Sequence, residues 1–168
     1  VIEAGTGVGK SLAYLAPAIK HALANQEKVV ISTNTINLQE QLVSKDLPAL
    51  VSILESIGAI PPNGIRFSLL KGKSNYLCIN RFNYMSDYQG ISSDEARLLS
   101  KIHLWMSDTQ NGDRSEINLS SRDQMMWNRV SSAENSWCPN LRSDEPCYLR
   151  NARLSAEEAD ILIVNHAL

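Results

Sequence analysis

A glycine-rich segment near the start of the chain constrains its fold more than any other feature. The segment reads Ala4-Gly5-Thr6-Gly7-Val8-Gly9-Lys10-Ser11. This order of small residues, followed by Gly-Lys-Ser, matches the phosphate-binding loop that joins a strand to a helix. Its glycines let successive backbone N–H groups converge on phosphates at the positive end of that helix. We expect residues 4–11 to bind a nucleoside triphosphate, with Lys10 on its phosphates and Ser11 on Mg²⁺. A glycine-rich turn without a ligand is the alternative.

The segments around this loop alternate between strand and helix patterns. Apolar residues recur at helical spacing after the loop, and Val29-Val30-Ile31 is a short apolar run typical of a buried strand. The patterns predict strands at 1–3, 28–32, 66–70 and 160–164, and helices at 10–24, from about 38 and at 151–159. Such alternation favours an α/β fold, in which right-handed crossovers connect the strands of a parallel sheet.

The alternation stops after residue 73 and resumes only near residue 151. All three cysteines and all three tryptophans lie between residues 78 and 147. We therefore predict three parts: residues 1–75 and 151–168 belong to the α/β domain, and residues 76–150 form a mainly helical insertion. Within the insertion, Ser92 and Glu95 have the spacing of a capping box, which predicts a helix that runs through Trp105.

Composition excludes several other classes of protein. The 168 residues carry 16 Lys and Arg against 18 Asp and Glu, a net charge of −2, so bulk charge gives no argument for nucleic-acid binding. The longest apolar runs are far shorter than the roughly 20 residues of a membrane span. Three cysteines cannot all pair with one another, which favours a reducing, cytoplasmic location. The missing N-terminal Met predicts a fragment of a longer protein.

The polar segment after the second expected strand is a candidate ligand-binding site. In parallel sheets such segments lie at the carboxyl ends of strands, where ligands bind. The candidate residues are Thr33, Asn34, Thr35, Gln39 and Gln41. An ordinary capped helix with exposed glutamines is the competing interpretation. Lys71 and Arg153 are further candidates for phosphate contacts, or else surface charges.

Two later segments complete an ordered set of motifs. The first runs from Leu70 to Cys78 and reads Leu-Lys-Gly-Lys-Ser-Asn-Tyr-Leu-Cys, and the second leads from Cys147 to the Val164-Asn165-His166 segment. Together with the phosphate-binding loop, they resemble the DinG branch of the XPD/DinG-like superfamily 2 DNA helicases. In that family a cysteine-ligated iron–sulfur domain interrupts the first motor domain.

The resemblance implies a RecA-like motor domain and a DNA helicase. The expected activity is ATP-driven 5′→3′ translocation on single-stranded DNA, with unwinding of duplex or forked DNA in repair or replication. Residues 33–35, 39 and 41 are then the contacts to the DNA strand. The resemblance also suggests that His166 couples the nucleotide to a downstream motif, and a hydrogen-bonded structural histidine is the alternative. The intact protein is expected to act as a monomer without a membrane.

The cysteines depart from the family pattern, because the chain has Cys78, Cys138 and Cys147 where four are expected. An iron–sulfur cubane normally takes four thiolates. Either a non-thiolate ligand completes the cluster, with Asp144 and His103 as candidates, or a three-iron or degenerate site replaces it. Zinc is a second possibility, and buried cysteines without a metal are a third. The preference for iron–sulfur comes from the resemblance. The tryptophans at 105, 127 and 137 are expected to pack in the core or beside the cluster, with base stacking as the alternative for Trp127 and Trp137.

A second departure is the absence of the acidic box that holds Mg²⁺. Asp94-Glu95-Ala96-Arg97 is similar in letters only and is expected to form the solvated first turn of a helix. The isolated chain is therefore expected to be inactive as an ATPase. The alternative function is a non-catalytic nucleic-acid-binding remnant with a metal-stabilised insertion. A P-loop phosphotransferase with a zinc-binding lid ranks behind it, because no acceptor site is found.

Overall fold

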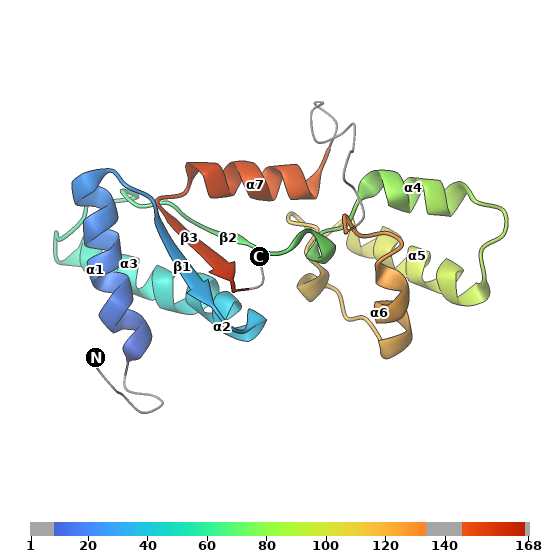
Figure 1. The fold of residues 1–168 in the computed structure, drawn as a ribbon, viewed down its shortest axis with the longest axis horizontal. Helices are drawn as coiled ribbons and strands as arrows, with labels where there is room; N and C mark the ends of the chain where they lie inside the picture. Colours follow the sequence, from blue (N-terminus) through green and yellow to red (C-terminus); the bar gives the residue numbers. More distant parts are fainter. Residues whose placement is uncertain (1–8, 134–145, 167–168) are drawn as a thin grey trace. The chain divides into compact units, whose positions relative to one another are not determined.

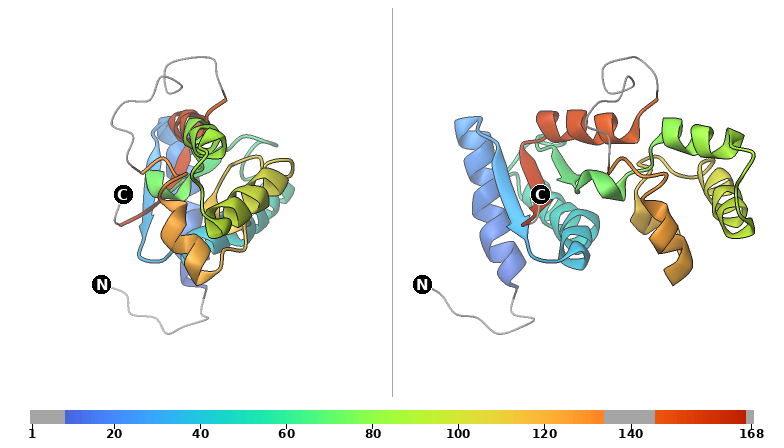
Figure 2. Two further views of the ribbon diagram at one scale, coloured as in Figure 1. Left: turned by 90° about the vertical axis from the view of Figure 1, so that its right-hand side faces the viewer. Right: turned by 45° about the vertical axis from the view of Figure 1, so that its right-hand side comes forward.

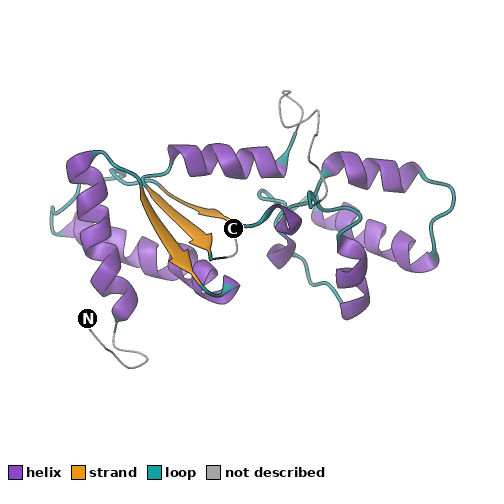
Figure 3. Cartoon of the chain, in the orientation of Figure 1, coloured by secondary structure: helices purple, strands orange, loops and turns teal. Residues whose placement is uncertain are grey.

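The computed structural model describes residues 9–133 and 146–166, and these fall into two compact units. Unit 1 comprises residues 1–71 and 154–168, and unit 2 comprises residues 72–153. The described strands all lie in unit 1, while the described part of unit 2 consists of helices and loops (Figure 3). The described parts of the chain contain no helix with the length and apolar character needed to cross a bilayer.

Unit 1 is built on a parallel sheet in the order β1-β3-β2 (Figure 1). Its strands are β1 (Val29–Thr33), β2 (Phe67–Leu70) and β3 (Ile161–Asn165). Both outer strands pair with β3 in matched register, since Val29 and Phe67 each lie opposite Ile161. The strand that comes last in the sequence is thus the central strand of the three, which confirms an α/β fold with a parallel sheet.

One face of this sheet packs against the helices of unit 1 (Figure 2). Alternate residues of a strand point to the same face, and here the odd-numbered strand residues join the core. Helix α1 (Lys10–Asn25) contacts β1 and β3, and α3 (Leu47–Ser56) contacts α1 and contributes to the same core. The fully buried members of this core include Leu15, Ile19, Leu42, Leu47, Ile161 and Ile163.

The helical segment between β1 and β2 contains a wide turn. Helix α2 (Ile36–Gln41) continues as η1, a π-helix over Leu42–Asp46, and then as α3. The Leu47 N–H donates to Leu42 O, five residues back, as a π-turn requires. Pro48 has no N–H to donate to the carbonyl of Ser44 and its ring would crowd that carbonyl in a regular α-helix. The wide turn accommodates this proline.

Unit 2 has a separate apolar core. Its helices are α4 (Ile79–Asp87), α5 (Ser93–Trp105), α6 (Ser121–Trp127) and the first part of α7 (Tyr148–Glu158), with short 3₁₀ turns η2 (Lys73–Asn75) and η3 (Arg114–Glu116). Trp127 is fully buried at its centre and donates from Nε1 to Ser74 O at 2.8 Å. Trp105 packs edge-on against it. Core packing of these two tryptophans is therefore confirmed, and Trp137 lies outside the described residues.

The predicted elements agree with the observed ones to within a few residues. The capping box of Ser92 and Glu95 is present at the start of α5, and Asp94 and Glu95 do form its first turn. Helix α7 begins three residues earlier than predicted, and the strands β1 and β3 each lie one residue later. The sequence patterns do not predict α4. The expected strand at residues 1–3 lies outside the described residues.

Candidate functional site

The described end of the phosphate-binding loop leads directly into α1. Gly9 has a φ of 77°, a left-handed conformation that glycine adopts without strain, and α1 begins at Lys10. The first turn of α1 contains no acidic residue. The N–H groups of this turn and the Lys10 ammonium therefore place positive charge at this end of the helix. Residues 4–8 lie outside the described residues, so the cradle itself is a prediction.

The ends of β1 and β3 are joined at the carboxyl edge of the sheet. The His166 N–H donates to Thr33 O at 2.9 Å. The His166 ring Nδ1 lies 3.1 Å from Ser32 Oγ, and the Asn165 amide donates to Asn34 O at 3.5 Å. These contacts fix the backbone from which α2 starts. They connect the Val-Asn-His segment to the polar segment that sequence reasoning selected as a nucleic-acid site.

Helix α2 begins with a side-chain cap at this edge. Thr35 is its N-cap residue, and its Oγ1 accepts the Leu38 N–H at 3.3 Å. The Thr33 hydroxyl donates to Thr35 O at 3.2 Å, which supports the turn before the helix. Such a cap satisfies one of the N–H groups that a helix start leaves without a partner. The turn and the cap together present residues 34 and 35 at the surface.

The five residues predicted to contact a nucleic-acid strand divide into two groups. Asn34, Thr35 and Gln41 are exposed, whereas Thr33 and Gln39 are buried. The exposed three can meet a ligand in this conformation. Direct contact through Thr33 or Gln39 requires their side chains to become accessible.

Gln39 is the most unusual of the five. Its side chain is fully buried, and neither Oε1 nor Nε2 finds a hydrogen-bond partner among the described residues. Gln41, half a turn further on, instead donates to Asp46 Oδ2 at 3.1 Å across the π-turn. A buried amide without partners costs about 1–3 kcal/mol. The position is thus poor for a residue with a purely structural role.

Lys71 is neither a surface charge nor free to meet a phosphate in this conformation. Its side chain is only 3% exposed, and Nζ lies 2.9 Å from Oε1 of Glu40 on α2. This corrects the interpretation of Lys71 as a surface charge. The burial of Lys71 depends on its contact with α2, and residue spacing in the sequence does not indicate such a contact. Arg153, the other residue considered, is exposed on α7.

The described cysteines of unit 2 lie near one glycine. Cys78 is buried and follows Leu77, whose N–H donates to Gly112 O at 2.9 Å. Cys147 precedes Tyr148, whose ring lies so close to Gly112 that a Cβ there would approach it to 2.3 Å. Two cysteines far apart in the sequence are thus each the chain neighbour of a residue that contacts Gly112.

A complete ligand set for a metal is not found in the described part of the chain. Among residues 9–133 and 146–166, no three His, Cys, Asp or Glu side chains are grouped for one ion. Cys138 and Asp144 lie outside the described residues. His103 is exposed on α5, where its ring stacks on Phe82 at a centroid distance of 6.5 Å.

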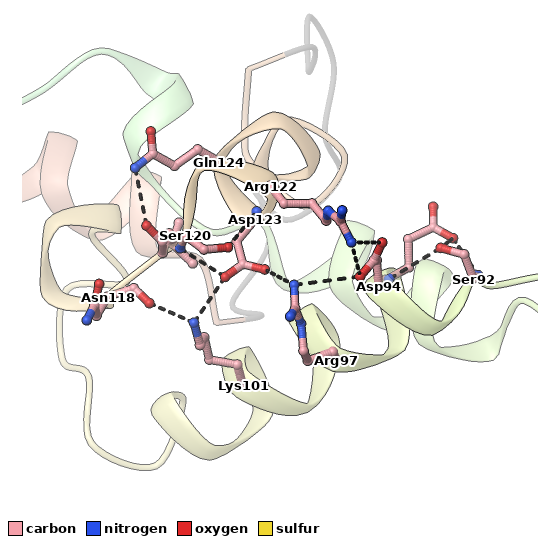
Figure 4. Close-up of polar contacts among 11 residues, drawn as sticks. Ser92, Asp94, Arg97, Lys101, Asn118, Ser120, Arg122, Asp123 and Gln124 are labelled. Carbon is pink, nitrogen blue, oxygen red and sulfur yellow. Dashed lines mark hydrogen bonds and ion pairs between the residues drawn. The ribbon is translucent and has the colours of Figure 1, made fainter.

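A polar network in unit 2 is centred on Asp123 (Figure 4). This carboxylate is 2% exposed and accepts from Lys101 at 3.0 Å and from Arg97 at 3.3 Å. Burial by itself raises the pKa of Asp123, but hydrogen bonds from Lys101 and Ser120 outweigh it and lower the pKa from 3.8 to about 2. Because both cations are on α5, Asp123 fastens α6 to that helix. We assign the network a structural role.

A cavity of about 520 Å³ lies at the opposite edge of the sheet in unit 1. It is lined by residues that precede the strands, including Lys28, Arg66 and Asp160. Lys28 Nζ donates to the Glu157 carbonyl at 2.9 Å, and Arg66 pairs with Asp160 at 3.5 Å. Ligands of open α/β sheets bind at the carboxyl ends of the strands. The carboxyl edge is therefore the better candidate site, despite the size of this cavity.

Known proteins are similar to the chain along its whole length. The chain is 41% identical over 174 residues to the ATP-dependent DNA helicase YoaA of Haemophilus influenzae, and 38% identical over 184 residues to the ATP-dependent helicase DinG of Mycobacterium tuberculosis. It is 30% identical over 168 residues to the 3'-5' exonuclease DinG of Bacillus subtilis. All of this chain is covered in each case, but it spans only 25%, 27% and 17% of those relatives. No protein-family model matches the chain.

A parallel sheet with a Gly-Lys-Ser sequence at the start of α1, together with these relatives, defines an α/β protein related to ATP-dependent helicases. The relatives named DinG and YoaA match this chain over its whole length. The chain belongs to the DinG branch of the XPD/DinG-like helicases, which confirms the resemblance seen in its motifs.

Proposed function

We propose that the chain is part of an ATP-dependent DNA helicase. Unit 1 is the first part of a RecA-like motor domain, and unit 2 is its insertion. The observation that carries the proposal is the hydrogen-bonded carboxyl edge, where β3 holds the start of α2 beside exposed Asn34 and Thr35. Relatives named as ATP-dependent helicases support it.

In this proposal the glycine-rich loop binds the nucleotide, and the segment after β1 binds DNA. Lys10 binds the β- and γ-phosphates of ATP, and the Ser11 hydroxyl is a ligand of Mg²⁺. Asn34, Thr35 and Gln41 contact the backbone of a single DNA strand. Thr33 supports the turn beneath them, and Gln39 reaches the strand only when α2 moves. The contacts of His166 with residues 32 and 33 transmit a displacement of β3 to the strand-binding segment.

The finer features of the activity are proposals as well. The protein translocates 5′→3′ on single-stranded DNA, opens forked or duplex DNA during repair or replication, and acts as a monomer in the cytoplasm. Substrates with a single 5′ or a single 3′ tail test the direction. Faster unwinding of the 3′-tailed substrate would contradict it.

The test of the nucleotide site is the variant Lys10→Ala in the full-length protein. We expect ATP hydrolysis and unwinding to fall by at least about a hundredfold, because the phosphate-binding lysine is lost. Lys20→Ala changes an exposed lysine on the same helix and serves as the matched control. Wild-type turnover by Lys10→Ala would overturn the site assignment. A wild-type protein that binds DNA without hydrolysing ATP would favour the non-catalytic remnant.

We also propose that Cys78, Cys138 and Cys147 hold a metal centre in unit 2, with iron–sulfur ahead of zinc. The convergence of Leu77 and Tyr148 on Gly112 supports it, because this brings the segments that carry two of the thiols together. Thiolates suit either iron–sulfur or zinc. Such a centre would cross-link segments 69 positions apart in the sequence, from Cys78 to Cys147.

The metal is tested by analysis of anaerobically purified full-length protein and of Cys138→Ser. Iron and acid-labile sulfide that are lost in the variant would support a cluster. Zinc in place of iron would identify the alternative metal. Colourless, metal-free wild-type protein would contradict the proposal.

A further inference from the structure

The chain leaves unit 1 at a buried lysine. Lys71 directly follows β2 and is the last residue of unit 1 before Gly72 begins unit 2. Its ammonium group is buried against Glu40, one residue before Gln41 on α2. One ion pair therefore connects Lys71, at the boundary between the units, to α2. This helix carries Gln41, a residue predicted to contact the DNA strand.

A purely structural contact does not need charges at this position. An ion taken out of water loses hydration, and apolar side chains of similar volume often replace a buried ion pair without loss of stability. An ion pair differs from apolar packing in that it depends on the position of two particular atoms. Here those atoms fix α2 relative to the end of β2.

Two further departures from regular packing lie in the same stretch of helix. Gln39, which precedes Glu40, is buried with no hydrogen-bond partner among the described residues. The π-turn begins at Leu42, two residues after Glu40. π-Turns and unsatisfied buried groups both concentrate at functional sites, where stability is not the only requirement. The sequence of this helical segment is therefore not optimised for stability alone.

We propose that Lys71 is a positioning residue for single-stranded DNA. Through Glu40 it fixes α2 so that Asn34, Thr35 and Gln41 face the strand together. The inference rests on the proposed function, in which those three residues touch DNA. It adds a route by which a displacement of the chain at Gly72 reaches the strand-binding helix.

The experiment measures DNA-stimulated ATP hydrolysis by the full-length protein, with an unstructured oligonucleotide such as oligo(dT) as the probe. Lys71→Met keeps the length of the side chain and removes its charge. We expect it to raise the DNA concentration for half-maximal stimulation about tenfold, with less than about a threefold loss of rate at saturating DNA. Lys73→Met, at an exposed lysine two residues later, is the matched control.

Two more variants separate positioning from stability. Glu40→Gln removes the charge of the more exposed partner and should raise the DNA requirement as Lys71→Met does. The charge exchange Lys71→Glu with Glu40→Lys should recover most of the loss. Melting temperature is followed for each variant, since a merely structural role lowers it without changing the DNA requirement of the folded protein.

The outcomes distinguish the positioning role of Lys71 from the proposed function. An unchanged DNA requirement in folded Lys71→Met and Glu40→Gln overturns the positioning role alone. A wild-type protein whose ATP hydrolysis does not respond to DNA overturns the proposed function, and the positioning role with it. A raised requirement in both single variants, with recovery in the exchange, establishes the inference.

Discussion

Asp123 shows how a single carboxylate can make the stability of unit 2 depend on pH. Its pKa is about 2 in the folded chain and 3.8 ordinarily. A depressed pKa means that the folded state holds the ionised form more strongly than the unfolded state does. The stabilisation is therefore complete above pH 3.8 and is lost as the pH falls through about 2.

The first prediction is that Asp123→Asn lowers the free energy of unfolding at pH 7 by about 2 kcal/mol. The loss arises because Lys101 and Arg97 keep their charges without the buried carboxylate. Urea unfolding measures it at pH 7 and again near pH 2.5, where the difference from wild type should shrink. Asp87→Asn, at an exposed acid on α4, is the control. A difference that stays constant with pH would contradict the assignment.

The second prediction concerns the two glutamines of α2. Gln39→Met should raise the free energy of unfolding by about 1 kcal/mol, because it removes a buried amide that lacks partners. Gln41→Met, at the exposed position, should give no gain. Thermal unfolding of both variants tests the difference. A loss of stability in Gln39→Met would mean that its amide has a partner in solution.

Gln39 and Gln41 also show how much the sequence predicts about individual residues. The motif identified both glutamines as candidates, but not which of them is buried. The orientation of each side chain depends on how α2 packs at the sheet edge, and residue spacing does not encode that. The burial of Lys71 was hidden for the same reason, since its partner Glu40 is 31 positions away.

At the scale of elements, local signals succeeded where they were complete. The capping box located α5, and short apolar runs located β1 and β3, because these patterns report hydrogen bonding and burial directly. Helix α4 was missed because its N-cap is Cys78, whose side chain makes no capping hydrogen bond. Tertiary packing of Phe82 and Met85 stabilises that helix.

Asp123 connects α6 to α5, and Gly112 allows the loop after α5 to contact the first turn of α7. The third prediction is that Gly112→Ala destabilises the chain by about 2–4 kcal/mol, since its φ is 61° and a Cβ would strike the Tyr148 ring. Gly58→Ala is the matched control: its φ is 69°, but no atom lies within 4 Å of the added Cβ. It should cost only about 1–2 kcal/mol.

Calorimetry of both glycine variants gives the comparison. Equal losses would mean that backbone conformation alone sets the requirement at Gly112. A larger loss at Gly112, accompanied by a lower metal content, would also support the proposed role of this contact in bringing the cysteine-bearing segments together.

At the scale of the whole molecule, the α/β class and the family were accessible from the order of motifs, because alternation and the phosphate-binding loop are local signals. The strand order was not, since a pattern of apolar runs does not say which strands are neighbours. The pairing of β3 with both β1 and β2 appears only in the structure.

The fourth prediction is that the 168-residue chain by itself hydrolyses ATP at less than about a hundredth of the full-length rate. In the proposed function the glycine-rich loop holds the phosphates, but hydrolysis also needs groups that position the water and stabilise the transition state. Parallel ATPase assays on the two proteins, with Lys10→Ala as the blank, test this. Comparable rates would show that the chain already contains those groups.

The position of β3 also sets the order in which the sheet can be assembled. β1 and β2 do not pair with each other, and the strand that joins them follows only after the whole of unit 2. On the ribosome, neither β1 nor β2 can pair with β3 while unit 2 is synthesised and forms its own core. Such long-range pairing slows folding and leaves strand edges open to wrong partners. Early compaction of unit 2 would shorten the effective loop between β2 and β3, so the folding of unit 2 affects how fast these two strands pair.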